Sequence, residues 1–162
     1  MPTEESITTI CLYQGRLNME VTQVPQSREE EVTTADIREY WGWVRQGIEE
    51  ILEEHKHLTF IPEDVYAECK SGRALFWVGP EVWAVTTAER DQFTGAQTCL
   101  IWLMWSSSKS TPAIFKYLRV MESIAAKSGF QGIEARTPLK GLGKSLERAG
   151  WSLDHIVYRK EL

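Results

Sequence analysis

The most constraining feature of this sequence is the strand-length segment Thr98–Trp105, which is apolar at every position from Cys99 onward and has polar residues on both sides. Side chains alternate between the two faces of a β-strand, so a run that is apolar at every position predicts a strand covered on both faces. Two further segments of strand character, 74–78 and 82–88, precede it and are joined by short turns. This order predicts an antiparallel meander whose last strand is central in the sheet.

Two helical segments precede the meander. Apolar residues recur at spacings of three and four between Ile37 and Leu52, which predicts an amphipathic helix with Asp36 near its N-cap. Pro62 favours the first turn of a second, shorter helix, and Gly72 favours its end.

After the apolar run the chain returns to helical spacing and then alternates again. A polar loop at 106–112 is followed by a helix over 114–125, a strand over 132–137, a helix over 142–149 and a final strand over 153–161. The strand–helix–strand passage predicts a parallel crossover. The fold class is therefore α/β, with a mixed sheet and helices on both faces. Residues 19–162 form a single domain in this interpretation, preceded by an N-terminal arm or strand over 1–18.

Charge is distributed unevenly along the chain. The net charge is -5, which disfavours broad contact with nucleic acid. Residues 106–162 nevertheless hold more than half of the Lys and Arg and fewer than a quarter of the Asp and Glu. A basic C-terminal third suits a phosphorylated cofactor or an acidic partner, although a solvated face has the same pattern.

The cysteines and the lengths of the apolar runs predict the cellular compartment of the protein. Cys11, Cys69 and Cys99 are odd in number and widely spaced, so we expect free thiols in a reducing environment and no metal site. No apolar run reaches the ~18 residues of a membrane span. The N-terminus carries acidic residues where a signal peptide has basic ones. We therefore expect a cytoplasmic protein without membrane contacts.

The closing segment carries the most specific local pattern. Leu146–Trp151 resembles the Tyr-Glu-Lys-Leu-Gly-Phe motif of GCN5-related N-acetyltransferases, and Tyr158–Leu162 resembles the last strand of that family. The order of elements over 19–162 is also similar. The resemblance implies an acetyl-CoA-dependent N-acyltransferase acting on an amine. The chain resembles, too, the acetyltransferase-like internal virion protein of T7-like phages, which implies a catalytically silent assembly or binding component located in a virion.

The family's phosphate-binding loop has a counterpart here that lacks glycine. In the family, a Gln/Arg-x-x-Gly-x-Gly/Ala loop follows the central strand and binds the coenzyme A pyrophosphate, and this position corresponds to 106–113. Backbone N–H groups at a helix N-terminus still favour an anion there, although an ordinary capped polar loop has the same residues. The predicted cofactor contacts are Ser107, Ser108, Lys109, Ser110, Thr111 and Lys144.

The resemblance also implies an opening between two strands. The strands at 98–105 and 132–137 are expected to run parallel and to diverge near their C-terminal ends. In the family, this divergence admits the pantetheine arm of the cofactor. Continuous pairing to the strand ends would argue against coenzyme A.

No residue is assigned as the catalyst. The family's Tyr that protonates the leaving thiolate aligns with Leu146, and the central strand carries no carboxylate. Side chains able to transfer a proton lie at strand turns, at a helix end and near the C-terminus. These candidates are Glu81, Glu89, Asp91, His55, His57 and Tyr158.

The seven tryptophans predict a large core. The odd spacing between Trp102 and Trp105 places them on opposite faces of a regular strand. Trp43 lies off the apolar stripe of its helix, so we expect it either at a protein-partner surface or partly buried. One contiguous core is predicted from Trp41, Val44, Ile48, Leu100, Trp102, Leu118, Met121 and Ile133.

Overall fold

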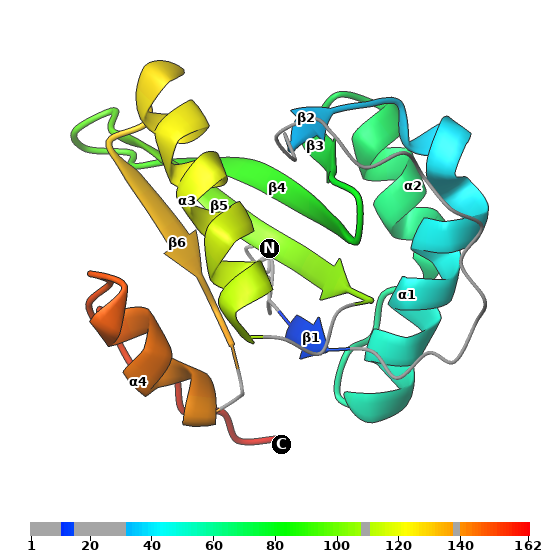
Figure 1. Ribbon diagram of the computed structural model, residues 1–162. Helices are drawn as coiled ribbons and strands as arrows, with labels where there is room; N and C mark the ends of the chain where they lie inside the picture. Colours follow the sequence, from blue (N-terminus) through cyan, green and yellow to red (C-terminus); the bar gives the residue numbers. More distant parts are fainter. Residues whose placement is uncertain (1–10, 15–31, 108–110, 138–139) are drawn as a thin grey trace.

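The computed structural model describes residues 11–14, 32–107, 111–137 and 140–162, with the backbone alone for 11–14, 111–113 and 140–141. In this part of the chain, strands form one mixed sheet in the order β1-β5-β4-β3-β2, and β6 also pairs with β5 (Figure 1). The strands are β1 (Cys11–Gln14), β2 (Thr33–Thr34), β3 (Ala74–Val78), β4 (Val82–Arg90), β5 (Gln97–Ser106) and β6 (Gly132–Ala135). The helices are η1 (Ile37–Tyr40), α1 (Trp41–Glu54), α2 (Pro62–Lys70), α3 (Thr111–Lys127) and α4 (Lys140–Arg148).

The antiparallel meander and the parallel crossover are both confirmed. β3, β4 and β5 pair antiparallel in sequence order, and β5 pairs parallel with β6 after the crossover through α3. β5 is the central strand, and most of its residues are buried. The apolar run is therefore buried on both faces of the strand, as its composition predicts, because helices cover both sides of the sheet.

The core is divided by the sheet into two clusters, so the prediction of one contiguous core was wrong. Leu100, Leu118 and Met121 belong to the cluster on the side of α3 and α4. Val44 and Ile48 belong to the cluster under α1 and α2. Periodicity identifies which residues are buried, but it does not tell which face of the sheet each helix covers.

A β-bulge at Trp102 overturns the expected placement of two tryptophans. Val85 pairs with Leu103 while Thr86 pairs with Ile101, so β5 has one extra residue at this point. The bulge resets the alternation of side chains along the strand. Trp102 and Trp105 consequently belong to the same cluster, on the α1 and α2 side.

The first helical segment is divided where its sequence predicts one helix. Asp36 is the N-cap, and its carboxylate accepts the backbone N–H of Arg38 at 2.9 Å. Residues Ile37–Tyr40 form a 3-10 turn before α1 begins at Trp41. Its apolar stripe buries Val44 and Ile48 as expected.

The predicted final strand over 153–161 does not form. Residues 151–162 contain neither helix nor strand, and Ile156, Val157 and Tyr158 are exposed. The last anchored side chain is Trp151, whose indole N–H donates to Glu122 Oε1 at 2.7 Å. A favourable strand composition does not suffice without a paired neighbour, and β6 is only four residues long.

Gly47 marks the closest approach of α1 to the sheet. A Cβ at this position would lie 2.7 Å from Cζ2 of Trp83 and 3.0 Å from Cδ2 of Trp105. We expect Gly47→Ala to lower the free energy of unfolding by about 1–3 kcal/mol, because overpacking outweighs the gain in helix propensity. Urea unfolding followed by circular dichroism measures this.

Gly42, in the same helix, is the matched control. No atom lies within 4 Å of a Cβ built there. Gly42→Ala should therefore leave stability unchanged or raise it by up to ~1 kcal/mol. If both alanine variants behave alike, the close approach of α1 to the two indoles is wrong.

Within the described residues, no helix combines the length and the apolar character needed to span a bilayer.

Candidate functional site

The expected site lies at the C-terminal ends of β5 and β6, and the predicted parallel pairing of these two strands is confirmed. The two strands pair only from Thr98↔Gly132 to Ile101↔Ala135. β5 then continues to Ser106, five residues beyond Ile101, which is its last residue paired with β6. β6 is paired with β5 along its whole length, and the edge of β5 beyond Ile101 is released from β6.

That released edge is taken by another part of the same chain. β1 pairs parallel with β5 in the register Cys11↔Leu103 to Gln14↔Ser106. β1 thus lies beside the half of β5 that β6 leaves (Figure 1). Side-chain patterning did not predict this pairing, because a four-residue strand near the N-terminus has many possible partners.

Trp102 lies where β5 changes partners. The β6 ladder ends at Ile101, and the β1 ladder begins at Leu103. On the other side, the bulge against β4 falls at the same residue. The registers give Trp102 no Cα partner on the described strands, so the bulge and the change of partner coincide at this residue.

The loop after β5 begins with a serine that is already engaged. Ser107 donates both its backbone N–H (2.9 Å) and its hydroxyl (3.3 Å) to the carbonyl oxygen of Glu81. Ser108, Lys109 and Ser110 lie outside the described residues. Ser107 is therefore held against the β3–β4 turn.

Two helices begin at the same edge of the sheet. α3 starts at Thr111, directly after β5, and α4 starts at Lys140, after β6. Because β5 and β6 are parallel, both helices begin at the carboxyl ends of these strands. Lys144 is exposed on α4. The N-terminus of α3 directs free backbone N–H groups toward this edge, which favours an anion.

The candidate carboxylate bases have structural partners. Glu89 Oε2 accepts from Arg136 at 2.9 Å. Asp91 Oδ1 accepts the backbone N–H groups of Phe93 and Thr94 in the β4–β5 turn, and these bonds lower its pKa. Glu89 is thus held by an ion pair with a distant residue, and Asp91 is held by the turn that it caps.

The candidate acids and histidines are no better placed for catalysis. Leu146, at the position of the family's Tyr, is buried in the core, and Tyr158 is exposed beyond α4. Burial, and then the nearby His57, lower the pKa of His55, whose ring lies 5.9 Å from that of His57. A neutral His55 at the end of α1 can accept a proton, but nothing in the described residues ties it to the β5–β6 opening.

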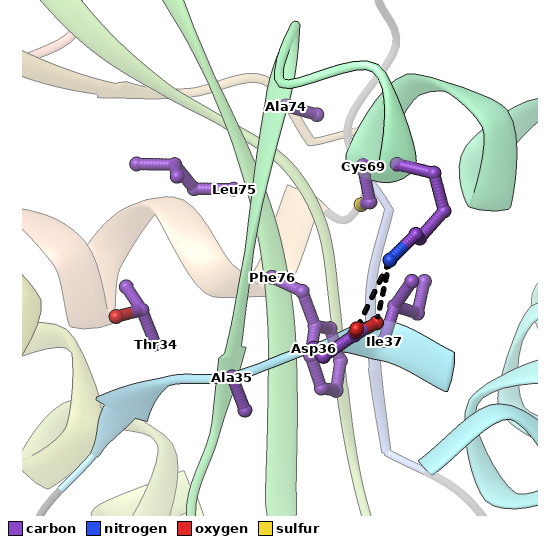
Figure 2. A pocket seen from close by; sticks show the side chains of 9 residues that line it. Thr34, Ala35, Asp36, Ile37, Cys69, Ala74, Leu75 and Phe76 are labelled. Atoms are coloured by element: carbon purple, nitrogen blue, oxygen red, sulfur yellow. Dashed lines mark hydrogen bonds and ion pairs between the residues drawn. The ribbon is translucent and has the colours of Figure 1, made fainter. Parts of the chain in front are cut away.

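A small cavity between η1, α2 and β3 is separate from this opening (Figure 2). Its volume is about 150 Å³, below the ~300 Å³ typical of ligand sites. On its wall, Lys70 Nζ donates to Asp36 Oδ2 at 3.0 Å. The backbone N–H of Arg38, followed by Lys70, holds the pKa of Asp36 well below its usual value. This ion pair ties η1 to α2 and serves the fold.

Comparison with known proteins identifies the fold. No protein-family model and no curated protein sequence matches the chain. Solved structures do match. A possible acetyltransferase from Clostridium difficile 630 superposes with a TM-score of 0.64 at 15% identity, covering 83% of this chain and 99% of the other.

Two further matches carry named activities. The ribosomal-protein-alanine N-acetyltransferase of Brucella melitensis biovar Abortus 2308 has a TM-score of 0.61 at 8% identity, covering 83% of this chain and 100% of its own. Glucosamine-6-phosphate N-acetyltransferase from Arabidopsis thaliana has a TM-score of 0.61 at 10% identity, covering 83% and 99%. The chain therefore has the GCN5-related N-acetyltransferase fold.

Proposed function

We propose that this chain is a divergent N-acyltransferase that takes acetyl-CoA as donor and an amine as acceptor. The observation that carries the proposal is the carboxyl-terminal half of β5, which extends beyond β6 beside the N-terminus of α3. Solved structures with this fold include N-acetyltransferases that act on a ribosomal protein and on an amino sugar phosphate. An amine acceptor is the class that these matches share.

The residues at the opening fit an extended, amide-bearing cofactor. The edge of β5 over Leu103–Ser106 offers backbone donors and acceptors at strand spacing, and it already binds one extended segment. The N-terminus of α3, with Lys109 and Lys144, supplies positive charge for phosphates. Acetyl-CoA, when bound, supplies the thioester from which the acyl group is transferred.

The bulge at Trp102 supplies a polarising group in this proposal. Trp102 lies between the residues of β5 that pair with β6 and those that pair with β1. A backbone N–H fixed by a rigid strand can stabilise charge that develops on a carbonyl oxygen. When acetyl-CoA is bound, the acceptor amine would attack the thioester carbonyl, the C–S bond would break, and the proton lost by the amine would pass through solvent to the coenzyme A thiolate that leaves.

Charge reversal at Lys109 tests the anion site. We expect Lys109→Glu to weaken acetyl-CoA binding at least tenfold, which corresponds to about 1.4 kcal/mol, because a carboxylate would oppose the pyrophosphate. Isothermal titration calorimetry measures the affinity. Lys56→Glu is the control, since Lys56 is exposed in the acidic part of the chain and should change little.

The second candidate is a catalytically silent protein with the same fold that serves as an assembly or binding component of a phage virion or another complex. Two observations favour it: β1 already pairs with the edge of β5, and Leu146 replaces the acid with a core side chain. Trp43, half-buried with its ring 5.8 Å from that of Trp105, is the proposed partner contact in this case. Absence of acetyl-CoA binding at millimolar concentration, or equal behaviour of the two charge reversals, would favour this candidate over the enzyme.

A further inference from the structure

We propose that β1 and the cofactor compete for the same edge of β5, so that the chain's own N-terminal strand closes the acyl-donor site until it is displaced. This inference rests on the proposed function. It follows from two ladders on one side of β5. β6 pairs with Thr98–Ile101, and β1 pairs with Leu103–Ser106.

The competition is one of backbone geometry. A strand edge offers its N–H and C=O groups to a single neighbour on that side. While β1 holds Leu103–Ser106, these groups are not available to the amides of a pantetheine arm. β1 is joined to the rest of the sheet by the chain itself, so a free ligand competes with an intramolecular strand whose effective concentration is high.

The pairing is also short enough to be displaced. β1 comprises four residues, and it is an edge strand of the described sheet. Short edge strands have few bonds to lose. Only molecules in which β1 has left β5 can bind coenzyme A in this proposal. The apparent Kd is therefore the intrinsic Kd divided by the fraction of such molecules.

Proline substitution in the full-length chain tests the competition. Along a strand, alternate residues direct their N–H groups to a given neighbour, so one of Leu12 and Tyr13 donates toward β5 and the double variant Leu12→Pro/Tyr13→Pro removes that donor. If β1 is seated in roughly nine molecules of ten, we expect this variant to bind coenzyme A up to about tenfold more tightly than wild type. Calorimetry with coenzyme A measures it. Hydrogen exchange should show faster exchange of those amides of 103–106 that face β1.

The pair Leu12→Ala/Tyr13→Ala is the matched control, because it removes the same side chains and keeps both N–H groups. A smaller gain in affinity is expected from it. If the alanine pair tightens binding as much as the proline pair, the effect belongs to the side chains and the strand-pairing inference is overturned.

A reversible disulfide lock that holds β1 on β5 provides the opposite test. Gln14 and Ser106 are register partners, and adjacent strands lie within disulfide range. In a Cys11→Ser background, oxidised Gln14→Cys/Ser106→Cys should show no detectable binding of coenzyme A, and dithiothreitol should restore it. The native thiols interfere little, because burial raises the pKa of Cys69 to about 12 and also raises that of Cys99.

The outcomes separate the two proposals. If coenzyme A binds wild type, the proline variant and the oxidised lock equally, the proposed function stands and the competition is overturned. If none of them binds it, reduced or oxidised, the proposed function itself fails. Tighter binding by the proline variant together with loss in the oxidised lock supports both.

Discussion

Replacing Trp105 with alanine should lower the free energy of unfolding by about 3–5 kcal/mol, the range for removal of a buried tryptophan. The side chain is fully buried, and its ring lies 6.3 Å from that of Trp83 in a stacked arrangement. Its indole N–H also donates to Glu50 Oε2 at 3.0 Å. The variant therefore loses apolar packing and leaves a cavity between β5 and α1. Urea denaturation followed by circular dichroism measures the change.

Two comparisons identify the cause of that loss. Trp105→Phe keeps an aromatic ring but removes the bond to Glu50, so it should cost less than the alanine variant. Phe93→Ala should cost little, because Phe93 is 97% exposed in the β4–β5 turn. A loss below ~1 kcal/mol for Trp105→Ala would contradict the packing of α1 on the sheet.

Leu118→Ala tests the opposite face of the sheet, with an expected loss of about 2–5 kcal/mol. Leu118 is fully buried and packs in the cluster that contains Leu100 and Met121. The cost has the same origin, namely lost burial and a cavity that the neighbours fill only partly. Thermal unfolding and urea titration should agree on its size.

Arg119, the next residue in α3, is exposed and serves as the control. Arg119→Ala should change stability by no more than ~0.5 kcal/mol. Because Leu118 and Trp105 lie in clusters on different faces of the sheet, their effects should add in the double variant. Strong non-additivity would indicate that the two clusters are one cooperative core after all.

Local pattern determined most of the framework of this protein. The apolar run Thr98–Trp105 became the central strand, and the alternating segments before it became β3 and β4. Pro62 opens α2, and Gly72 follows its end with a φ of 78°. These outcomes depend on side-chain periodicity and on the backbone preferences of single residues, both of which are local properties.

The candidate site was predicted only in its outline. Strand–helix–strand order predicted two parallel strands with a helix N-terminus at their carboxyl ends, and the family resemblance implied the opening between them. It did not show that Ser107 is held by Glu81, or that Glu89 is bonded to Arg136. Those partners are far away in the sequence, and only folding brings them together.

Tertiary structure alone decided three features: the bulge at Trp102, the pairing of β1 with β5, and the unpaired segment after Trp151. A bulge changes the face of every later side chain, yet it leaves no mark in a strand that is apolar throughout. A short strand acquires its position from whichever edge is free, which here is the half of β5 that β6 leaves. Strand propensity is therefore a property of the segment, whereas strand pairing is a property of the whole sheet.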